Sequence, residues 1–192
     1  MLTKRKFLVA AAATLATPAL PAFAHHRKAY VVPEEHKPTI VRVKKEFGPN
    51  EIHVDPNNFY LYFTMGKRKA IRYVCGVGRP GLYEAGTFTV GRKREWPSWR
   101  PTPSMIKRQP EVYGKYADGV PGGPNNPLGS RALYLHNANG YDTMLRIHGT
   151  PKPWTIGSAV SNGCARLVNA HIEHLYEQVP VGSKVVLYPQ IT

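Results

Sequence analysis

The chain has 192 residues, of which 42% are hydrophobic and 20% are charged, and it contains 18 prolines and 17 glycines. These values suit one globular domain and argue against a collagen, a coiled coil or a wholly disordered chain. The formal net charge of +14 favours a polyanionic partner or surface. Two cysteines are too few for a dense disulfide scaffold.

The first 24 residues are predicted to be an export signal. A basic stretch at Lys4–Lys6 precedes an apolar run over residues 7–16, and Ala22 and Ala24 are small residues suited to cleavage. Residues 3–8 resemble a twin-arginine signal with lysine at the first arginine position, so either export route is open. The apolar run is shorter than the roughly 20 residues that cross a bilayer. We expect an exported, periplasmic protein that is soluble after signal removal and has no stable membrane insertion.

The rest of the chain predicts an extension followed by a mainly β domain. Residues 25–49 are rich in charge, histidine and proline, which predicts a tether or a packed-on extension. Over residues 50–190, short β-branched and aromatic runs alternate with turn formers, which predicts seven or eight strands in a sandwich or barrel-like fold. The expected strands are Glu51–Asp55, Phe59–Phe63, Ala70–Val77, Thr87–Val90, Leu133–His136, Met144–His148 and Lys184–Tyr188.

Three other segments have patterns of their own. Residues 91–130 hold seven prolines and six glycines with little periodicity, which indicates either a rigid connector or a basic, aromatic-lined lid over a cleft. The Asn139-Gly140 step predicts a hairpin. Asn169 is expected to cap a single amphipathic helix, in which apolar residues recur at helical spacing up to Val179.

Cys164 and His148 are the densest candidates for chemistry. A free thiol has a pKa of about 8.5, and a histidine within hydrogen-bond reach can take its proton and leave a nucleophilic thiolate. Gly163 permits a tight turn that would aim backbone N–H groups at a substrate carbonyl beside the sulfur. Such donors would stabilise the oxyanion that forms on attack.

Two structural interpretations compete with this one. Cys75 and Cys164 could form a disulfide in an exported protein. Alternatively, Cys164 could bind zinc together with His148, His171 or His174, although the His-x-x-His spacing is a loose metal pattern and no second cysteine lies close by.

An ordered set of motifs resembles the catalytic domain of the L,D-transpeptidases (YkuD-like), cysteine-dependent enzymes that act on bacterial peptidoglycan. The motifs are Gly76–Arg79, Gly86–Phe88 with Lys93, Trp96–Trp99, Asn126–Gly129, Arg131–Leu135, Ile147–Thr150 and the Ser-x-Gly-Cys-x-Arg signature at Ser161–Arg166. The resemblance implies a β-rich catalytic domain over residues 50–190, with the helix after the nucleophile loop.

The same resemblance implies a role for each residue of the site. Cys164 is the expected nucleophile and His148 its general base, with the backbone carbonyl of Gly149 orienting the imidazole. The N–H groups of Gly163 and Cys164 are the expected oxyanion donors. The residues expected at the substrate are Ser161, Asn162 and Arg166, of which the last is expected chiefly to brace the loop.

The implied reaction is attack on the third-residue carbonyl of a stem tetrapeptide, release of D-alanine and transfer of the acyl group to an amine. A second stem, water or an envelope protein could be the acceptor, and water would make the protein an L,D-carboxypeptidase. The expected partners are peptidoglycan stem peptides and, in the last case, an envelope protein, with no nucleic acid, cofactor or metal. A noncatalytic cell-wall-binding module and a cysteine peptidase are the alternatives.

Overall fold

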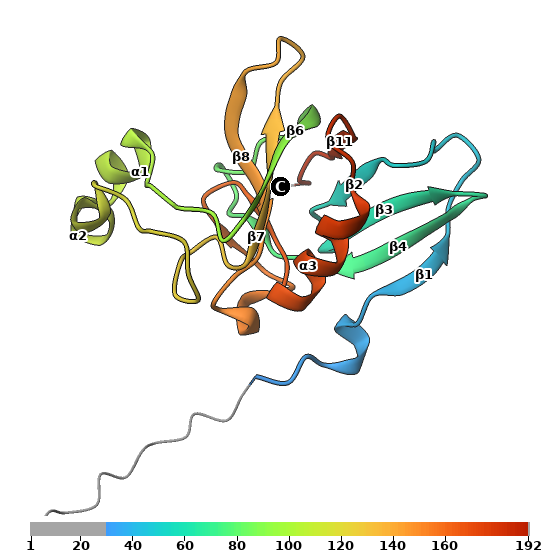
Figure 1. Ribbon diagram of the computed structural model, residues 1–192, viewed down its shortest axis with the longest axis horizontal. Helices are drawn as coiled ribbons and strands as arrows, with labels where there is room; N and C mark the ends of the chain where they lie inside the picture. Colours follow the sequence, from blue (N-terminus) through green and yellow to red (C-terminus); the bar gives the residue numbers. More distant parts are fainter. Residues whose placement is uncertain (1–29, 192) are drawn as a thin grey trace, which may run out of the picture.

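The computed structural model describes residues 30–191 (Figure 1). The predicted export signal and the first residues of the predicted extension lie outside the described residues. A nine-stranded sheet has the order β1 (Thr39–Arg42), β4 (Lys69–Val74), β3 (Tyr60–Gly66), β2 (Ile52–Asp55), β11 (Lys184–Leu187), β6 (Gly86–Glu95), β7 (Arg131–His136), β8 (Asp142–His148) and β10 (Ala165–Arg166). A second sheet pairs β5 (Val77–Gly78) with β9 (Ala159–Ser161) in parallel.

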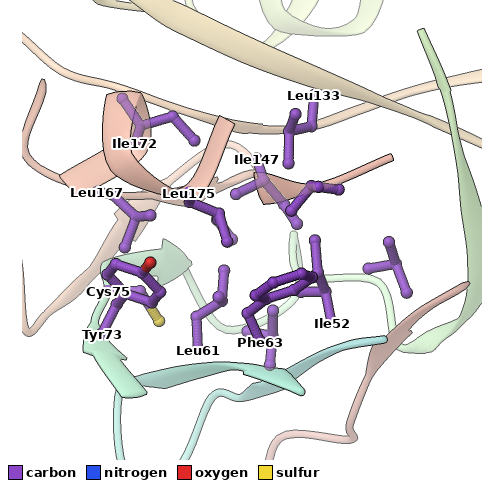
Figure 2. Close-up of a cluster of buried hydrophobic side chains, with 14 of the residues drawn as sticks. Ile52, Leu61, Phe63, Tyr73, Cys75, Leu133, Ile147, Leu167, Ile172 and Leu175 are labelled. Atoms are coloured by element: carbon purple, nitrogen blue, oxygen red, sulfur yellow. The ribbon is translucent and has the colours of Figure 1, made fainter. Parts of the chain in front are cut away.

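The large sheet curves so that its two halves enclose one core. Leu61 and Phe63 from β3 belong to the same buried cluster as Leu133 from β7 and Ile147 from β8, and Figure 2 shows these side chains facing one another. The mainly β fold is therefore confirmed. Strands β1 and β10 stand at opposite ends of the strand order, so the sheet is not closed into a barrel.

Helix α3 (Asn169–Gln178) covers the core beside β7, as the apolar spacing predicts. Its side chains Ile172 and Leu175 are fully buried, and each such burial stabilises the fold by about 1.5–3 kcal/mol. The predicted cap is wrong, because the N-cap residue is Val168 and Asn169 is the first helical residue. The Asn169 side chain instead accepts hydrogen bonds from two other loops, described below.

The structure has eleven strands within residues 30–191, more than the seven or eight predicted. Strand β6 continues past Val90 because a bulge at Gly91 lets it keep pairing with β7 up to Glu95. Strand β1 lies in the segment predicted to be an extension and pairs antiparallel with β4. The Asn139-Gly140 hairpin joins β7 and β8 as predicted, with Gly140 at a φ of 79°.

Residues 96–130 form an ordered excursion from the sheet. It contains α1 (Pro103–Arg108), α2 (Pro110–Tyr113) and the 3-10 turn η2 (Gly114–Tyr116), which lie across β7 and β8 from β1–β4 in Figure 1. Trp99 exchanges two backbone hydrogen bonds with Val120 and packs its ring near Tyr113 and Tyr116. Aromatic and backbone contacts thus fix a segment that has no periodic pattern.

Two further 3-10 turns complete the described elements, η1 (Glu34–His36) and η3 (Pro153–Thr155). Among the helices of residues 30–191, none has the length and apolar content needed to cross a bilayer.

Candidate active site

The parallel pairing of β8 with β10 places the site. Ile147 lies opposite Ala165 and His148 opposite Arg166 in this register. Because side chains alternate between the faces of a strand, Ile147 and Ala165 point into the core, as their burial in one cluster shows. His148 and Arg166 point to the other face, and Cys164 directly precedes β10.

His148 is a buried base with a defined orientation. Its side chain is 5% exposed, and Nδ1 lies 2.6 Å from the carbonyl oxygen of Gly149. Since a carbonyl only accepts, Nδ1 carries the proton and donates it, which leaves the Nε2 lone pair to accept a proton. Burial lowers the pKa of His148 to about 3, an effect that the Gly149 carbonyl opposes and the charge of Arg166 reinforces. The imidazole is therefore neutral at physiological pH.

Cys164 is half-buried at the end of the nucleophile loop, which we define as residues 161–164. Burial raises the pKa of its thiol, and the Arg146 backbone N–H and the charges of Arg146 and Arg166 partly offset that effect. The resting site thus holds a neutral thiol and a neutral imidazole. Two neutral groups suit a mechanism in which the thiol gives its proton to the imidazole during attack on the substrate. A preformed thiolate–imidazolium pair is not needed for this mechanism.

Cys164 directly precedes β10, in which Arg166 pairs with His148 of β8. Within residues 30–191 no hydrogen bond joins the Cys164 sulfur to the His148 ring. Catalytic hydrogen bonds commonly tighten only when substrate binds.

The nucleophile loop is closed by the hydroxyl of Ser161. This hydroxyl donates to the Cys164 carbonyl at 2.6 Å and accepts from the Gly163 N–H at 3.2 Å. The Gly163 N–H, expected as an oxyanion donor, is therefore already used within the loop. The Cys164 N–H makes no hydrogen bond to residues 30–191 and remains available to a substrate oxygen.

Gly163 is the one loop position where backbone geometry dictates the residue. Its φ of 128° is a conformation that side-chain-bearing residues rarely adopt. A Cβ there would also lie 2.9 Å from the carbonyl oxygen of Leu82. The loop in turn packs against the end of β5, where a Cβ on Gly78 would lie 2.8 Å from the Gly163 Cα.

The side chains expected at the substrate already have protein partners. Asn162 contacts Arg79, Arg108 and Tyr113, none of which was a candidate from the sequence. Arg166 is buried and its Nη2 donates to the carbonyl oxygen of Thr155 at 3.4 Å, a contact suited to bracing the loop.

Arg146 holds a second positive charge at this face. Its guanidinium forms a bidentate pair with Asp142, at 2.6 and 2.9 Å, and lies 4.1 Å from the centre of the Tyr134 ring. Arg146 stands four residues after Asp142 on β8, and pairing with β7 brings Tyr134 opposite. This fixed charge favours the thiolate of Cys164.

Asn169 supports the loop that follows His148. Its Oδ1 accepts from the backbone N–H of Thr150 at 3.1 Å and from that of Ser130 at 3.3 Å. A Cβ on Gly149 would lie 2.3 Å from this oxygen, which is why glycine follows the histidine. One side chain thereby ties the start of β7 to the carbonyl that orients the imidazole.

Replacing Asn169 with alanine is expected to destabilise the protein by about 2–3 kcal/mol, because two partly buried N–H groups lose their acceptor. Urea unfolding followed by circular dichroism measures this free energy. Asn137→Ala, in the exposed hairpin turn, is a control that removes an asparagine whose Oδ1 likewise accepts two backbone N–H bonds. Equal losses for the two variants would show that the Asn169 contacts have no special role in the core.

The two competing structural interpretations find no support. Cys75 and Cys164 are both free, and Cys75 is fully buried beside Tyr73 in the core (Figure 2), which contradicts the disulfide interpretation. Its thiol acts as a small apolar group. The Tyr73 hydroxyl and His174 Nδ1 share a hydrogen bond of 2.8 Å, and the part of the chain that the structure describes has no group of three or more potential metal ligands.

The sequence also matches a known protein family. The family model for the L,D-transpeptidase catalytic domain (YkuD) matches residues 49–187. The chain belongs to the L,D-transpeptidase catalytic-domain family. It is 37% identical over 120 residues to the Probable L,D-transpeptidase ErfK/SrfK of Escherichia coli K12, which is 62% of this chain and 37% of that protein. Identity to the Probable L,D-transpeptidase YbiS of that strain is 36% over 126 residues, or 65% and 39% of the two chains.

The matched part of this L,D-transpeptidase-family chain thus spans less than two fifths of the length of these relatives. Among solved structures, a Brucella melitensis protein described as a probable carnitine operon oxidoreductase is 44% identical, with a TM-score of 0.56 over 82% of this chain and 96% of that one. The Enterococcus faecium L,D-transpeptidase C442S mutant superposes with a TM-score of 0.52 over 73% and 50% of the two chains. Its 17% identity shows the shared fold alone.

Proposed function

We propose that the protein is a peptidoglycan L,D-transpeptidase in which Cys164 is the nucleophile and His148 the general base. The observation that supports this proposal is the register of β8 and β10, which pairs His148 with Arg166, two residues after Cys164, on the face of the sheet away from the core. That face also holds the buried cations Arg146 and Arg166, which favour negative charge on sulfur. Family membership supplies the class of reaction.

The first half-reaction forms a thioester. His148 Nε2 takes the thiol proton as the Cys164 sulfur attacks the carbonyl carbon of the third residue of a stem tetrapeptide. The Cys164 N–H donates to the oxyanion, and the imidazolium then returns its proton to the nitrogen of the departing D-alanine as the C–N bond breaks. The Gly149 carbonyl holds the ring in one tautomer throughout.

The second half-reaction transfers the acyl group. A side-chain amine of another stem attacks the thioester carbonyl, loses a proton to His148 and displaces the sulfur, which regains a proton. The product is a link between the third residues of two stems. Water or an envelope-protein amine would give a trimmed peptide or an anchored protein through the same steps.

The charge of the chain suits this substrate and place of action. Stem peptides carry carboxylates, and the excess of basic residues, which persists after removal of Lys4, Arg5 and Lys6 with the export signal, raises their local concentration at the protein surface. Because peptidoglycan lies outside the inner membrane, the proposal includes export through residues 1–24 to the periplasm.

The test is to incubate the purified protein with disaccharide-tetrapeptide and to follow free D-alanine and product masses. Release of D-alanine with a crosslinked dimer supports transpeptidation, and release with a trimmed monomer identifies water as the acceptor. Binding of the peptide without any release favours the noncatalytic wall-binding module. Cleavage of casein, with intact muropeptide, favours the cysteine peptidase.

A further inference from the structure

Hydrogen-bond donors converge on one amide beside the nucleophile. Arg79, directly after β5, and Arg108, at the end of α1, donate through Nη2 to Asn162 Oδ1 at 2.9 and 3.3 Å. Tyr113, at the end of α2, accepts from Asn162 Nδ2 at 2.8 Å, so its own hydroxyl hydrogen is still available. Two chain segments far apart in sequence, residue 79 and residues 108–113, thus meet at the nucleophile loop.

This cluster holds two cations and no anion. Neither Arg79 nor Arg108 forms an ion pair with residues 30–191, and the Asn162 oxygen is the acceptor of the one side-chain hydrogen bond that each makes there. The Arg79 Nε is buried without a partner. Two like charges brought to one neutral oxygen repel each other, and a bound anion would relieve that repulsion. The planar guanidinium fork fits a carboxylate.

The cluster also lies close to the reacting atom. The Arg79 N–H donates to the Ser161 carbonyl at 3.0 Å, which fixes the root of its side chain to the nucleophile loop. Residues 162 and 164 are two positions apart, so their Cα atoms are separated by at most about 7 Å. A peptide acylating Cys164 therefore has its neighbouring carboxylates within reach of Arg79 and Arg108. Arg166, bonded to the Thr155 carbonyl, is committed elsewhere.

We propose that Arg79 and Arg108, with the Tyr113 hydroxyl, form a carboxylate-binding subsite that receives the terminal carboxylate of the residue leaving the acyl donor. In the free protein, Asn162 Oδ1 occupies the place of one carboxylate oxygen. The substrate class is a peptide whose leaving residue ends in a free acid. This inference rests on the proposed function, because it assigns the substrate to the same nucleophile.

The test measures binding without turnover, in the full chain carrying Cys164→Ala. Calorimetric titration compares three synthetic tetrapeptides: the free acid, the C-terminal amide, and a peptide with the third-residue side-chain carboxyl amidated. In this background, Arg79→Gln and Arg108→Gln are each expected to weaken binding of the free acid about tenfold and to leave binding of the C-terminal amide unchanged. Lys107→Gln, which removes the same charge from an exposed neighbour on α1, is the matched control and should leave all three affinities unchanged.

Asn162→Asp is a second, nearly isosteric variant. It places a carboxylate of the protein's own between the two guanidiniums, so it is expected to raise the melting temperature and to weaken binding of the free acid. A lower melting temperature, or unchanged binding of the free acid, would overturn the subsite.

The remaining outcomes separate the subsite from the proposed function. Three results would overturn the subsite. The arginine variants could lose as much affinity for the C-terminal amide as for the free acid, they could behave like Lys107→Gln, or no peptide could bind. The arginine variants could instead weaken binding only of the peptides whose third-residue side-chain carboxyl is free. The subsite would then bind that carboxylate, and its assignment to the C-terminal carboxylate would be overturned. If the protein with Cys164 intact releases no D-alanine while the acid–amide difference holds, the subsite stands and the proposed reaction fails.

Discussion

Replacing Cys164 with alanine is expected to abolish thioester formation and to lower the rate of D-alanine release by at least about 10³-fold, because the attacking atom is lost. Intact-protein mass spectrometry checks this result directly. The parent protein should gain the mass of the acyl group when mixed with disaccharide-tetrapeptide, whereas the Cys164→Ala variant should keep its own mass.

Cys75→Ala is the matched control for this substitution. Cys75 is fully buried in the core, and burial raises the pKa of its thiol, so it contributes neither an accessible nor an ionised sulfur. The control should acylate and turn over like the parent. An acyl group found on Cys75, or normal turnover by Cys164→Ala, would contradict the assignment of the nucleophile.

The pH profile of kcat/KM is expected to stay flat from neutral pH down to about pH 4. A general base works in its unprotonated form, and burial lowers the pKa of His148 to about 3, so lowering the pH to 4 leaves the imidazole neutral. Burial also raises the pKa of Cys164, which keeps the thiol protonated beyond its ordinary range. D-Alanine release between pH 4 and 9 at constant ionic strength measures the profile.

His148→Gln tests the same base by removal. The rate at neutral pH is expected to fall about 10²–10⁴-fold and then to rise with pH, because only the spontaneously formed thiolate can attack. His174→Gln, an exposed histidine on α3, should retain both the rate and the flat profile. A parent profile with an inflection near pH 6.5 would instead show an imidazole with an unshifted pKa.

Periodic segments of the sequence predict the parts of the fold that the structure confirms. Short β-branched and aromatic runs between turn formers place β2, β3, β4, β7 and β8, and apolar residues at helical spacing place α3. Strands β5, β9 and β10 have two or three residues each, including Gly78 and Ser161, and so carry no period. These short strands form because segments that are distant in sequence pair with one another.

The candidate site divides in the same way. Cys164 and His148 can be proposed as a pair from thiol and imidazole chemistry, and the family resemblance assigns their roles. The partners of Asn162 cannot be named from the sequence, because Arg108 lies 54 positions away and Arg79 lies 83 positions away. The role of Asn169 was misjudged for the same reason: its local position suggests a helix cap, while its oxygen serves Ser130 and Thr150 across the fold.

The pairing of β1 with β4 sets a limit on truncation. The family match begins at residue 49, so a fragment cut there would lack β1. The edge of β4 thereby uncovered includes Ala70 and Ile71, both buried in the intact protein. The unpaired N–H and C=O groups of β4 would then be able to pair with strands of other molecules. In the intact protein the edge strand is β1, which ends in Arg42 and is followed by Lys44 and Lys45, and these charges discourage aggregation. A fragment that keeps the edge of β4 covered therefore starts before Thr39.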